Sequence, residues 1–372
     1  MNNYARSENQ ETFVLNLGPQ HPATHGVLRV KLTMDGEYIV HAEPVLGYIH
    51  RMHEKMGENR TWAQFMPNTA RMDYLGALSY NHGYALAVER AAGIEVPERA
   101  EYIRVITVEL NRIASHLLWF GAFVLDLGGF TPLLYAFDDR EKILDLLESV
   151  TGARLTFCYF RFGGVYNDID DEFIAGTTAF IKRLRERMPD YHNLVTKNII
   201  MIKRLKGIGI LPEEMCRRYG ATGPVLRGSG VQYDVRKNEP YSVYPEFDFD
   251  VPVYSECDSM ARYMVRMDEI EQSMRIVEQA IAKLPEGEYI APKVPKIVKP
   301  EPGDYYACVE AARGTFGVRL VSDGSNTAYR LKLRSPTFSN MSLYGEACQG
   351  MLLADALALM GSLDLVIPEI DR

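Results

Sequence analysis

The chain has 372 residues, of which 47% are hydrophobic and 24% are charged. This composition excludes a disordered chain, a collagen-like chain and a small disulfide scaffold, and the length allows two or three domains or one large one. The formal charge of −8 argues against a general nucleic-acid-binding protein.

The N-terminal part of the chain has the pattern of β-strands. Apolar-rich runs at residues 12–17, 27–34 and 37–43 predict three strands, and the turn signal Asp35-Gly36 joins the last two. Residues 18–26, between the first two strands, contain two glycines, two prolines and two histidines. This composition predicts a loop of fixed shape.

Helical periodicity begins at about residue 71 and predicts five long helices. Pro97 suits the first turn of the second helix, which should end at Gly128-Gly129. We expect Pro189 to kink or break the fourth helix, and Ser255 with Asp258 resembles a capping box at the start of the fifth. The predicted helices cover residues 71–93, 97–128, 133–150, 170–206 and 255–284.

The end of the chain returns to strands. Residues 291–303 contain four prolines and predict a linker. Strands are expected at 305–311, 317–322 and 328–333, and a last helix at 345–360. This order predicts one mainly helical α+β domain over residues 1–372, in which the N- and C-terminal strands form a small antiparallel sheet. Its expected parts are a β segment at 1–45, a helical body at 46–290, the linker at 291–303 and a β/α segment at 304–372.

Cysteines and apolar runs restrict the kind of protein further. None of the five cysteines forms a C-x-x-C pair, so we expect no zinc ribbon, no local iron–sulfur site and no metal held by this chain. The polar N-terminus has no signal-peptide core. The longest apolar run, residues 117–125, is ended by Asp126 and is shorter than the roughly 20 residues that cross a membrane.

Two histidine pairs are candidate site residues. His21 and His25 lie in the proline-bearing loop, which does not provide the helix or the glutamate of an H-E-x-x-H zinc site. They either make ordinary hydrogen bonds or present an imidazole to a ligand. His50 and His53 are spaced as metal ligands can be, but two more ligands would be needed, and an exposed basic turn is an equally good interpretation.

Tyr74 and Asp126 are the other candidates. Tyr74 is either a core aromatic residue or a phenol that donates a proton to a bound carbonyl group. Asp126 lies near a helix C-terminus, where the helix dipole disfavours an anion. It either faces water or is buried and needs a partner such as a histidine. Gly228-Ser229-Gly230 lacks the third glycine of a dinucleotide site and predicts a tight turn.

One long motif connects these residues. Leu17-Gly18-Pro19-Gln20-His21-Pro22-Ala23-Thr24-His25-Gly26-Val27-Leu28-Arg29 closely resembles the signature of the D subunit of proton-pumping NADH:quinone oxidoreductase, respiratory complex I. That family is related to the large subunit of nickel–iron hydrogenases. Further matching segments follow nearly to the end of the chain: Gly47-Tyr48-Ile49-His50-Arg51, Arg71-Met72-Asp73-Tyr74, Leu125-Asp126-Leu127-Gly128, Arg161-Phe162-Gly163-Gly164-Val165, Leu226-Arg227-Gly228-Ser229-Gly230, Leu320-Val321-Ser322-Asp323-Gly324 and Glu369-Ile370-Asp371-Arg372.

The resemblance implies a hydrogenase-large-subunit-like fold and roles for single residues. Members of this family form one wall of the quinone cavity, and the B subunit forms the other wall and carries the terminal [4Fe-4S] cluster. The quinone-binding pair of the family maps onto His25 and Tyr74, with His21 beside them. The carboxylate that partners the histidine maps onto Asp126. The arginine next to the cluster maps onto Arg51, adjacent to His50.

The resemblance also implies where the chain works. It would be one subunit of a proton-translocating respiratory-chain complex that binds NADH elsewhere, inactive alone and without a cofactor of its own. Its partners would be quinone, the B, C, I and H subunits and, through them, the membrane surface, with no nucleic acid. Its place would be the cytoplasmic face of the bacterial inner membrane. We expect quinone reduction to draw protons from Tyr74 and His25.

Some positions depart from the family pattern and leave alternatives open. The cysteine pairs that hold nickel and iron in hydrogenases are missing, which argues against hydrogenase chemistry. Met52, His53, Ala70 and Met351 also differ from the usual residues, with effects that the sequence does not define. The same subunit type serves complexes fed by formate, ferredoxin or hydrogen. A non-catalytic assembly scaffold and a zinc hydrolase are weaker alternatives, and the sequence does not choose between ubiquinone and menaquinone.

Overall fold

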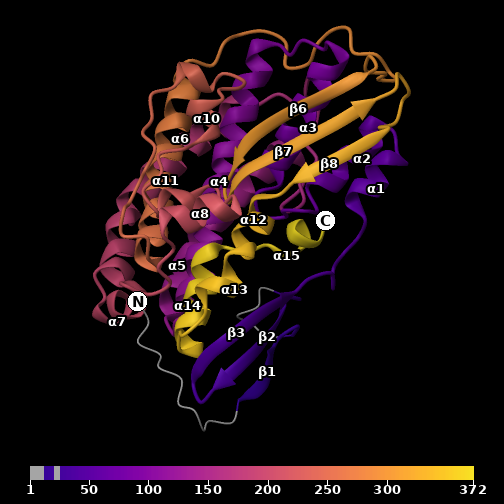
Figure 1. Cartoon of the computed structure of the whole chain (residues 1–372). Coiled ribbons are helices and arrows are strands. Elements are labelled where there is room, and N and C mark those ends of the chain that lie inside the picture. Colours follow the sequence, from indigo (N-terminus) through magenta and orange to yellow (C-terminus); the bar gives the residue numbers. More distant parts are fainter. Residues whose placement is uncertain (1–11, 21–25) are drawn as a thin grey trace.

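The computed structural model describes residues 12–20 and 26–372, which fold as a helical body with three small antiparallel sheets (Figure 1). The predicted α+β, mainly helical class is therefore confirmed. The strands are β1 (Phe13–Leu17), β2 (Arg29–Asp35), β3 (Tyr38–Val45), β4 (Phe160–Arg161), β5 (Gly164–Val165), β6 (Gly303–Ala311), β7 (Gly314–Ser322) and β8 (Arg330–Arg334). The longer helices are α3 (Ala77–Ala92), α4 (Glu98–Asp126), α5 (Phe130–Thr151), α6 (Asp171–Tyr191), α11 (Ser259–Ala282) and α14 (Leu353–Leu363).

Short helices fill the segments between these elements. They are α1 (His53–Glu58), α2 (Trp62–Thr69), α7 (Ile199–Leu205), α8 (Glu213–Tyr219), α9 (Pro224–Arg227), α10 (Val235–Asn238), α12 (Pro336–Ser342), α13 (Tyr344–Ala347) and α15 (Ile367–Asp371). A π-helical turn covers His192–Thr196 and a 3-10 turn covers Tyr244–Glu246. Residues 291–302 contain no helix or named strand, as expected for the linker.

The N-terminal sheet has the antiparallel order β1-β2-β3. Val30, Leu32 and Met34 of β2 are buried and alternate with polar residues, the pattern of a strand with one covered face. They share one hydrophobic cluster with Tyr344 of α13 and Leu359 of α14. The first strands of the chain are therefore covered by its last helices.

The helical body is built around α4, a helix of 29 residues that packs against α5 and α11. Pro97 is its N-cap, in agreement with the predicted start of this helix. The helix ends at Asp126, two residues before the predicted glycine pair. The apolar residues that recur along it are all buried, as their spacing predicts: Ile103, Ile106, Leu110, Ile113, Leu117 and Phe120.

The C-terminal sheet has the antiparallel order β6-β7-β8, and α3 packs against it. The ring of Tyr80 in α3 stacks on Phe316 in β7, with 3.9 Å between the ring centroids. The prediction that N- and C-terminal strands form one sheet is wrong, because each sheet covers its apolar face with different helices. A single bridge between Tyr38 and Leu352 joins the N-terminal sheet to the segment before α14.

Several helix predictions need correction. The helix expected from residue 71 begins only at Ala77, and α1 and α2, of six and eight residues, were not predicted because they are too short to show periodicity. Asp258, not Ser255, is the N-cap of α11, since its side chain accepts a hydrogen bond from the Ala261 amide at 2.8 Å. The break after Pro189 is confirmed by the end of α6 at Tyr191.

The expected helix at 345–360 is interrupted at Gly350. This residue has a φ of 73°, in the left-handed region that favours glycine. Its amide donates to the carbonyl of Ile39 at 2.7 Å, and the Ile39 amide donates to the carbonyl of Met351 at 2.9 Å. Backbone pairing with β3 therefore replaces helical hydrogen bonds between α13 and α14.

The core of the helical body contains charged side chains in pairs. Glu109 of α4 lies 3.1 Å from both Arg112 and Arg236, and all three are buried. Burial alone would raise the pKa of Glu109, but these two guanidinium groups and the hydroxyls of Tyr244 and Ser273 lower it to about 2. The carboxylate is therefore ionised and is shared by two guanidinium groups, of which Arg236 also pairs with Asp234 at 2.6 Å.

Within the described residues, no helix combines the length and the apolar character that crossing a bilayer would require.

Candidate functional site

The structure describes some of the predicted site residues and not others. His21 and His25 lie outside the described residues, so every contact expected of them stays a prediction. Tyr74, Asp126, His50, Arg51 and His53 lie within the described part of the chain.

Tyr74 lies on a tight turn between α2 and α3. The carboxylate of Asp73 accepts hydrogen bonds from the amides of Leu75 at 3.1 Å and Gly76 at 3.0 Å, which delays the start of α3 to Ala77. The Tyr74 side chain is 36% exposed, whereas Asp73 is completely buried. Tyr74 is therefore exposed at the surface, and the turn that carries it is held by the buried carboxylate of Asp73.

Arg313 lies beneath this turn and was not predicted. Its guanidinium lies 2.8 Å from Asp73 and 3.2 Å from Asp364, and it also donates to the hydroxyl of Ser115 at 3.2 Å. Arg313 comes from the turn between β6 and β7, and Asp364 follows α14. Three distant parts of the chain thus meet below Tyr74.

This environment keeps the phenol protonated. Burial raises the pKa of the Tyr74 hydroxyl, and the nearby carboxylates of Asp73 and Asp364 oppose the lowering effect of Arg313. A neutral phenol can donate a hydrogen bond or a proton to an acceptor at the surface. Of the two alternatives for Tyr74, the core aromatic residue is wrong, because the side chain is exposed.

Asp126 is the last residue of α4 and is exposed. Of the two alternatives left open by the sequence, the exposed position at the helix end is therefore the one found for Asp126 in this chain, because α4 ends at the surface. Leu125, Phe130 and Leu134 are 40%, 60% and 54% exposed. Asp126 thus belongs to an apolar surface segment of the kind that partner proteins cover.

His50 and Arg51 lie on an exposed loop between β3 and α1. The carboxylate of Asp371 accepts hydrogen bonds from the amides of Gly47 and Ile49, both at 2.9 Å. The Nδ1 atom of His50 donates to the main-chain carbonyl of Asp371 at 2.5 Å. The loop is therefore tied to the C-terminus of the chain.

His53, two residues after Arg51, is buried at the start of α1. Burial lowers its pKa to about 4, and the charge of Arg51 and the nearby His50 add to this effect. His50 is exposed and His53 is not, so the segment is not simply an exposed basic turn. Among the described residues, no group of three or more histidine, cysteine, aspartate or glutamate side chains could hold a metal ion.

The C-terminal segment, residues 364–372, links the two halves of the candidate site. Asp364 pairs with Arg313 below Tyr74, and Asp371 holds the His50 loop. The segment Glu369-Ile370-Asp371-Arg372 was recognised as a motif, but no sequence signal pointed to its contacts. Nothing in the sequence singled out Arg313.

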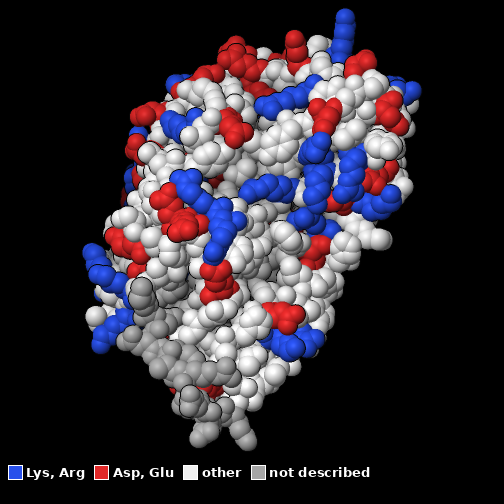
Figure 2. Space-filling model, in the orientation of Figure 1, with Lys and Arg blue, Asp and Glu red and all other residues white. Residues whose placement is uncertain are grey.

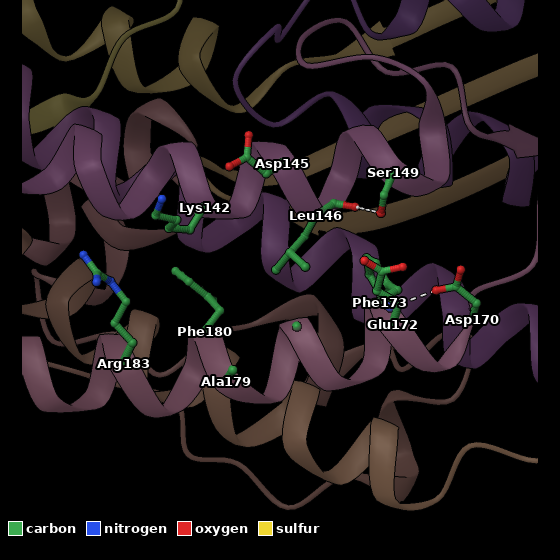
Figure 3. A pocket seen from close by; sticks show the side chains of 11 residues that line it. Lys142, Asp145, Leu146, Ser149, Asp170, Glu172, Phe173, Ala179, Phe180 and Arg183 are labelled. Atoms are coloured by element: carbon green, nitrogen blue, oxygen red, sulfur yellow. Dashed lines mark hydrogen bonds between the residues drawn. The ribbon is translucent and has the colours of Figure 1, made fainter.

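One of the surface pockets in the described part of the chain includes a predicted site residue, and a larger one does not. One of about 340 Å³ is lined by His50, Asp371 and four cations, namely Lys55, Arg330, Lys332 and Arg372. Another of about 520 Å³ lies between α5 and α6, with Leu146, Phe173 and Phe180 on its walls (Figure 3). The second pocket contains none of the predicted site residues.

Comparison with known proteins gives a consistent result. The family model described as "Respiratory-chain NADH dehydrogenase, 49 Kd subunit" matches residues 126–302 and 294–372. The chain is 74% identical to the D subunit of the NADH-quinone oxidoreductase of Desulfotalea psychrophila over 362 residues, 97% of both chains. It is 65% identical to the D 2 subunit of the Opitutus terrae enzyme over 362 residues, 97% of this chain and 91% of the relative. It is 58% identical to the D subunit of the Syntrophobacter fumaroxidans enzyme over 363 residues, 98% of this chain and 97% of the relative.

Proposed function

The chain belongs to the family of the 49-kDa subunit of respiratory-chain NADH dehydrogenase, and we propose that it builds the quinone site of such a complex. The family membership inferred from the sequence motifs is thereby confirmed, as is the conclusion that the chain is a subunit of an NADH-quinone oxidoreductase. The quinone cavity, the proton donors and the individual partners are the content of the proposal.

The geometry around Tyr74 is the observation that supports this function best. Tyr74 lies at the surface on a turn whose next two amides donate to the buried carboxylate of Asp73, and this carboxylate pairs with the buried Arg313. Removing one partner of such a buried ion pair costs about 3–5 kcal/mol, because the remaining charge is left buried without a counter-charge. A turn of this kind fixes the point on the surface from which the Tyr74 side chain emerges, which helps to place a hydrogen-bond donor for a ligand.

The proposed chemistry uses two donors because quinone reduction takes up two electrons and two protons. Tyr74 donates to one quinone carbonyl and His25 to the other. Asp126 orients the His25 ring and stabilises its charged form. The [4Fe-4S] cluster of the partner B subunit supplies the electrons, and Arg51 faces that cluster from this chain.

Replacement of Tyr74 by phenylalanine tests the donor role. We expect Tyr74→Phe to lower the quinone reductase rate of the assembled complex by about 10²- to 10⁴-fold, because a positioned general acid contributes this much. The ring and its packing are kept, so assembly should survive. The measurement is quinone-dependent NADH oxidation by the purified complex at limiting and saturating quinone.

A matched control removes a hydroxyl elsewhere. Tyr135 in α5 is 37% exposed, close to the 36% of Tyr74, and Tyr135→Phe should leave the rate unchanged. Unchanged turnover of Tyr74→Phe at limiting quinone would exclude Tyr74 as a proton donor. An equal loss of the quinone reductase rate in both variants would instead indicate that either substitution damages the complex as a whole.

The proposed partners follow from the same assignment. They are quinone and the B, C, I and H subunits, with the chain peripheral on the cytoplasmic face of the bacterial inner membrane. NADH is the proposed electron donor because the names of the relatives state it. Quinone reduction with formate, ferredoxin or hydrogen but not with NADH would favour the related complexes, and isolation without an iron–sulfur partner would favour a scaffold.

A further inference from the structure

The last two residues of the chain hold the loop that carries Arg51. Gly47 and Ile49 each donate a main-chain hydrogen bond to a different carboxylate oxygen of Asp371, both at 2.9 Å. His50 adds a third bond to the carbonyl of Asp371. These contacts span more than 300 residues of sequence, so they fix the loop to a distant part of the fold.

The other side of the loop is held by Arg372. Its Nε atom lies 3.3 Å from the carboxylate of Glu54 in α1, and its guanidinium lies 4.8 Å from the ring centroid of Phe338. Glu54 is fixed in turn by Lys332 at 2.9 Å. Arg51 therefore lies between two segments that both contact the C-terminus.

The C-terminus is itself firmly anchored. Ile367 and Ile370 of α15 are buried, and the Thr337 amide donates to the carboxyl group of Glu369 at 3.0 Å. Asp371 is only 7% exposed. The carboxylate that holds the loop thus belongs to an anchored segment at the edge of a surface pocket and not to a free tail.

We propose that Asp371 is a positioning residue that sets the place of Arg51 relative to the partner's iron–sulfur cluster. This inference rests on the proposed function, in which Arg51 faces that cluster. A cation near a cluster stabilises its reduced form, and the Coulomb energy falls as the distance grows. In Asp371→Asn one of the two acceptor oxygens becomes an NH2 group that cannot accept, so the amide of Gly47 or of Ile49 loses its acceptor and Arg51 moves away from its place.

The direction of the effect distinguishes positioning from a direct charge effect. Loss of the Asp371 negative charge alone would raise the reduction potential of a nearby cluster. Displacement of the Arg51 cation would lower it. A lowered potential in Asp371→Asn is therefore explained by the loop and not by the deleted charge.

The experiment uses the complex purified from native membranes with variants of this chain. We expect Asp371→Asn to speed hydrogen exchange in the peptide covering residues 47–51 and to lower the midpoint potential of the terminal cluster in an EPR redox titration. Asp371→Glu, which keeps the carboxylate, should restore part of both properties and serves if the asparagine variant does not assemble. Asp170→Asn is the matched control, because Asp170 accepts a main-chain hydrogen bond at the start of α6.

A double variant completes the test. Arg51→Gln should lower the potential, and adding Asp371→Asn to it should lower the potential no further, since Asp371 acts through Arg51. A raised or unchanged potential in Asp371→Asn, or additive effects in the double variant, would overturn the positioning role. If Arg51→Gln alone leaves the potential unchanged, the placement of Arg51 in the proposed function fails, whatever happens to the exchange of the loop.

Discussion

Arg313 shows how single residues of the site depend on distant parts of the chain. It is completely buried and pairs with Asp73, 240 residues earlier, and with Asp364, 51 residues later. The sequence motif identified Asp73 and Tyr74, because they lie in one segment. It did not identify Arg313, because an isolated arginine in a turn has no local signal of its role.

His53 provides a pH-dependent prediction at the same scale. Its pKa is lowered by burial to about 4 in the folded chain, against about 6.5 for an ordinary histidine. Between these values the unfolded chain binds a proton that the folded chain does not, so stability falls as the pH falls from 6.5 toward 4. We expect His53→Met to reduce this loss by up to about 1.4 kcal/mol per pH unit.

Urea unfolding of both proteins at a series of pH values between 8 and 4 measures this difference. Above pH 7 the two stability curves should be parallel, and below pH 6.5 the curve of the parent protein should fall more steeply. Parallel curves over the whole range would show that His53 titrates alike in the folded and unfolded chain.

At the scale of elements, residue periodicity predicted the long helices and failed for short ones. The spacing of apolar residues located α5, which has one covered face, and α4, whose apolar residues recur at helical spacing although the helix is buried on all sides from Tyr102 to Leu117. It missed α1 and α2, and it joined α13 and α14 into one helix. Backbone pairing between β3 and the segment around Gly350 decided that break, and such pairing leaves no mark on periodicity.

The contact between α3 and the C-terminal sheet depends on a glycine. A Cβ atom on Gly83 would lie 2.9 Å from Phe316 and 3.1 Å from Val309, both in the core. We expect Gly83→Ala to lower the free energy of unfolding by about 1–3 kcal/mol, because the sheet would have to move away from the helix. Chemical denaturation of the purified protein measures it.

Gly176 in α6 is the matched control. A Cβ atom there would lie 2.8 Å from the end of the flexible Leu146 side chain, beside the pocket between α5 and α6 (Figure 3). Leu146 can move into that pocket, so Gly176→Ala should be neutral or stabilise by up to about 1 kcal/mol through helix propensity. Equal destabilisation by both substitutions would contradict this account of the α3 contact.

At the scale of the whole molecule, charge is unevenly distributed. The chain has a net charge of −8, yet Lys and Arg side chains gather over the strands of the C-terminal sheet (Figure 2). The exposed cations Arg319, Arg330 and Lys332 belong to this face, and Glu54 and Glu58 of α1 pair with two of them. The alternation of charged and apolar residues in β8 explains why its cations all point outward.

We expect an insertion in the exposed linker to cost less stability than the same insertion in a connection that is packed against another backbone segment. The linker at residues 291–302 is exposed around Lys296 and Ile297, so inserting Gly-Ser-Gly between them should cost less than about 1 kcal/mol, since closure entropy grows slowly with loop length. The same insertion after Gly223 should cost several times more. A Cβ atom on Gly223 would lie 2.4 Å from the Cα atom of Gly314, so two backbone segments cross there.

Thermal unfolding of the two insertion variants gives the comparison. We expect a small decrease in the unfolding temperature for the insertion in the linker and a large decrease for the insertion after Gly223. Similar decreases in the unfolding temperature would mean that the linker contributes to stability as strongly as the backbone contact between Gly223 and Gly314 does.

Local sequence patterns were enough for the class of fold, for most of the long elements and, through the motifs, for the family. These properties depend on residues that are close in sequence, where periodicity and spacing act. The separation of the two sheets and the contacts of Arg313 and Asp371 came only from the folded chain, which also decided between the two positions that the sequence left open for Asp126. A periodic pattern shows which face of an element is covered, but the partner that covers it depends on packing across hundreds of residues.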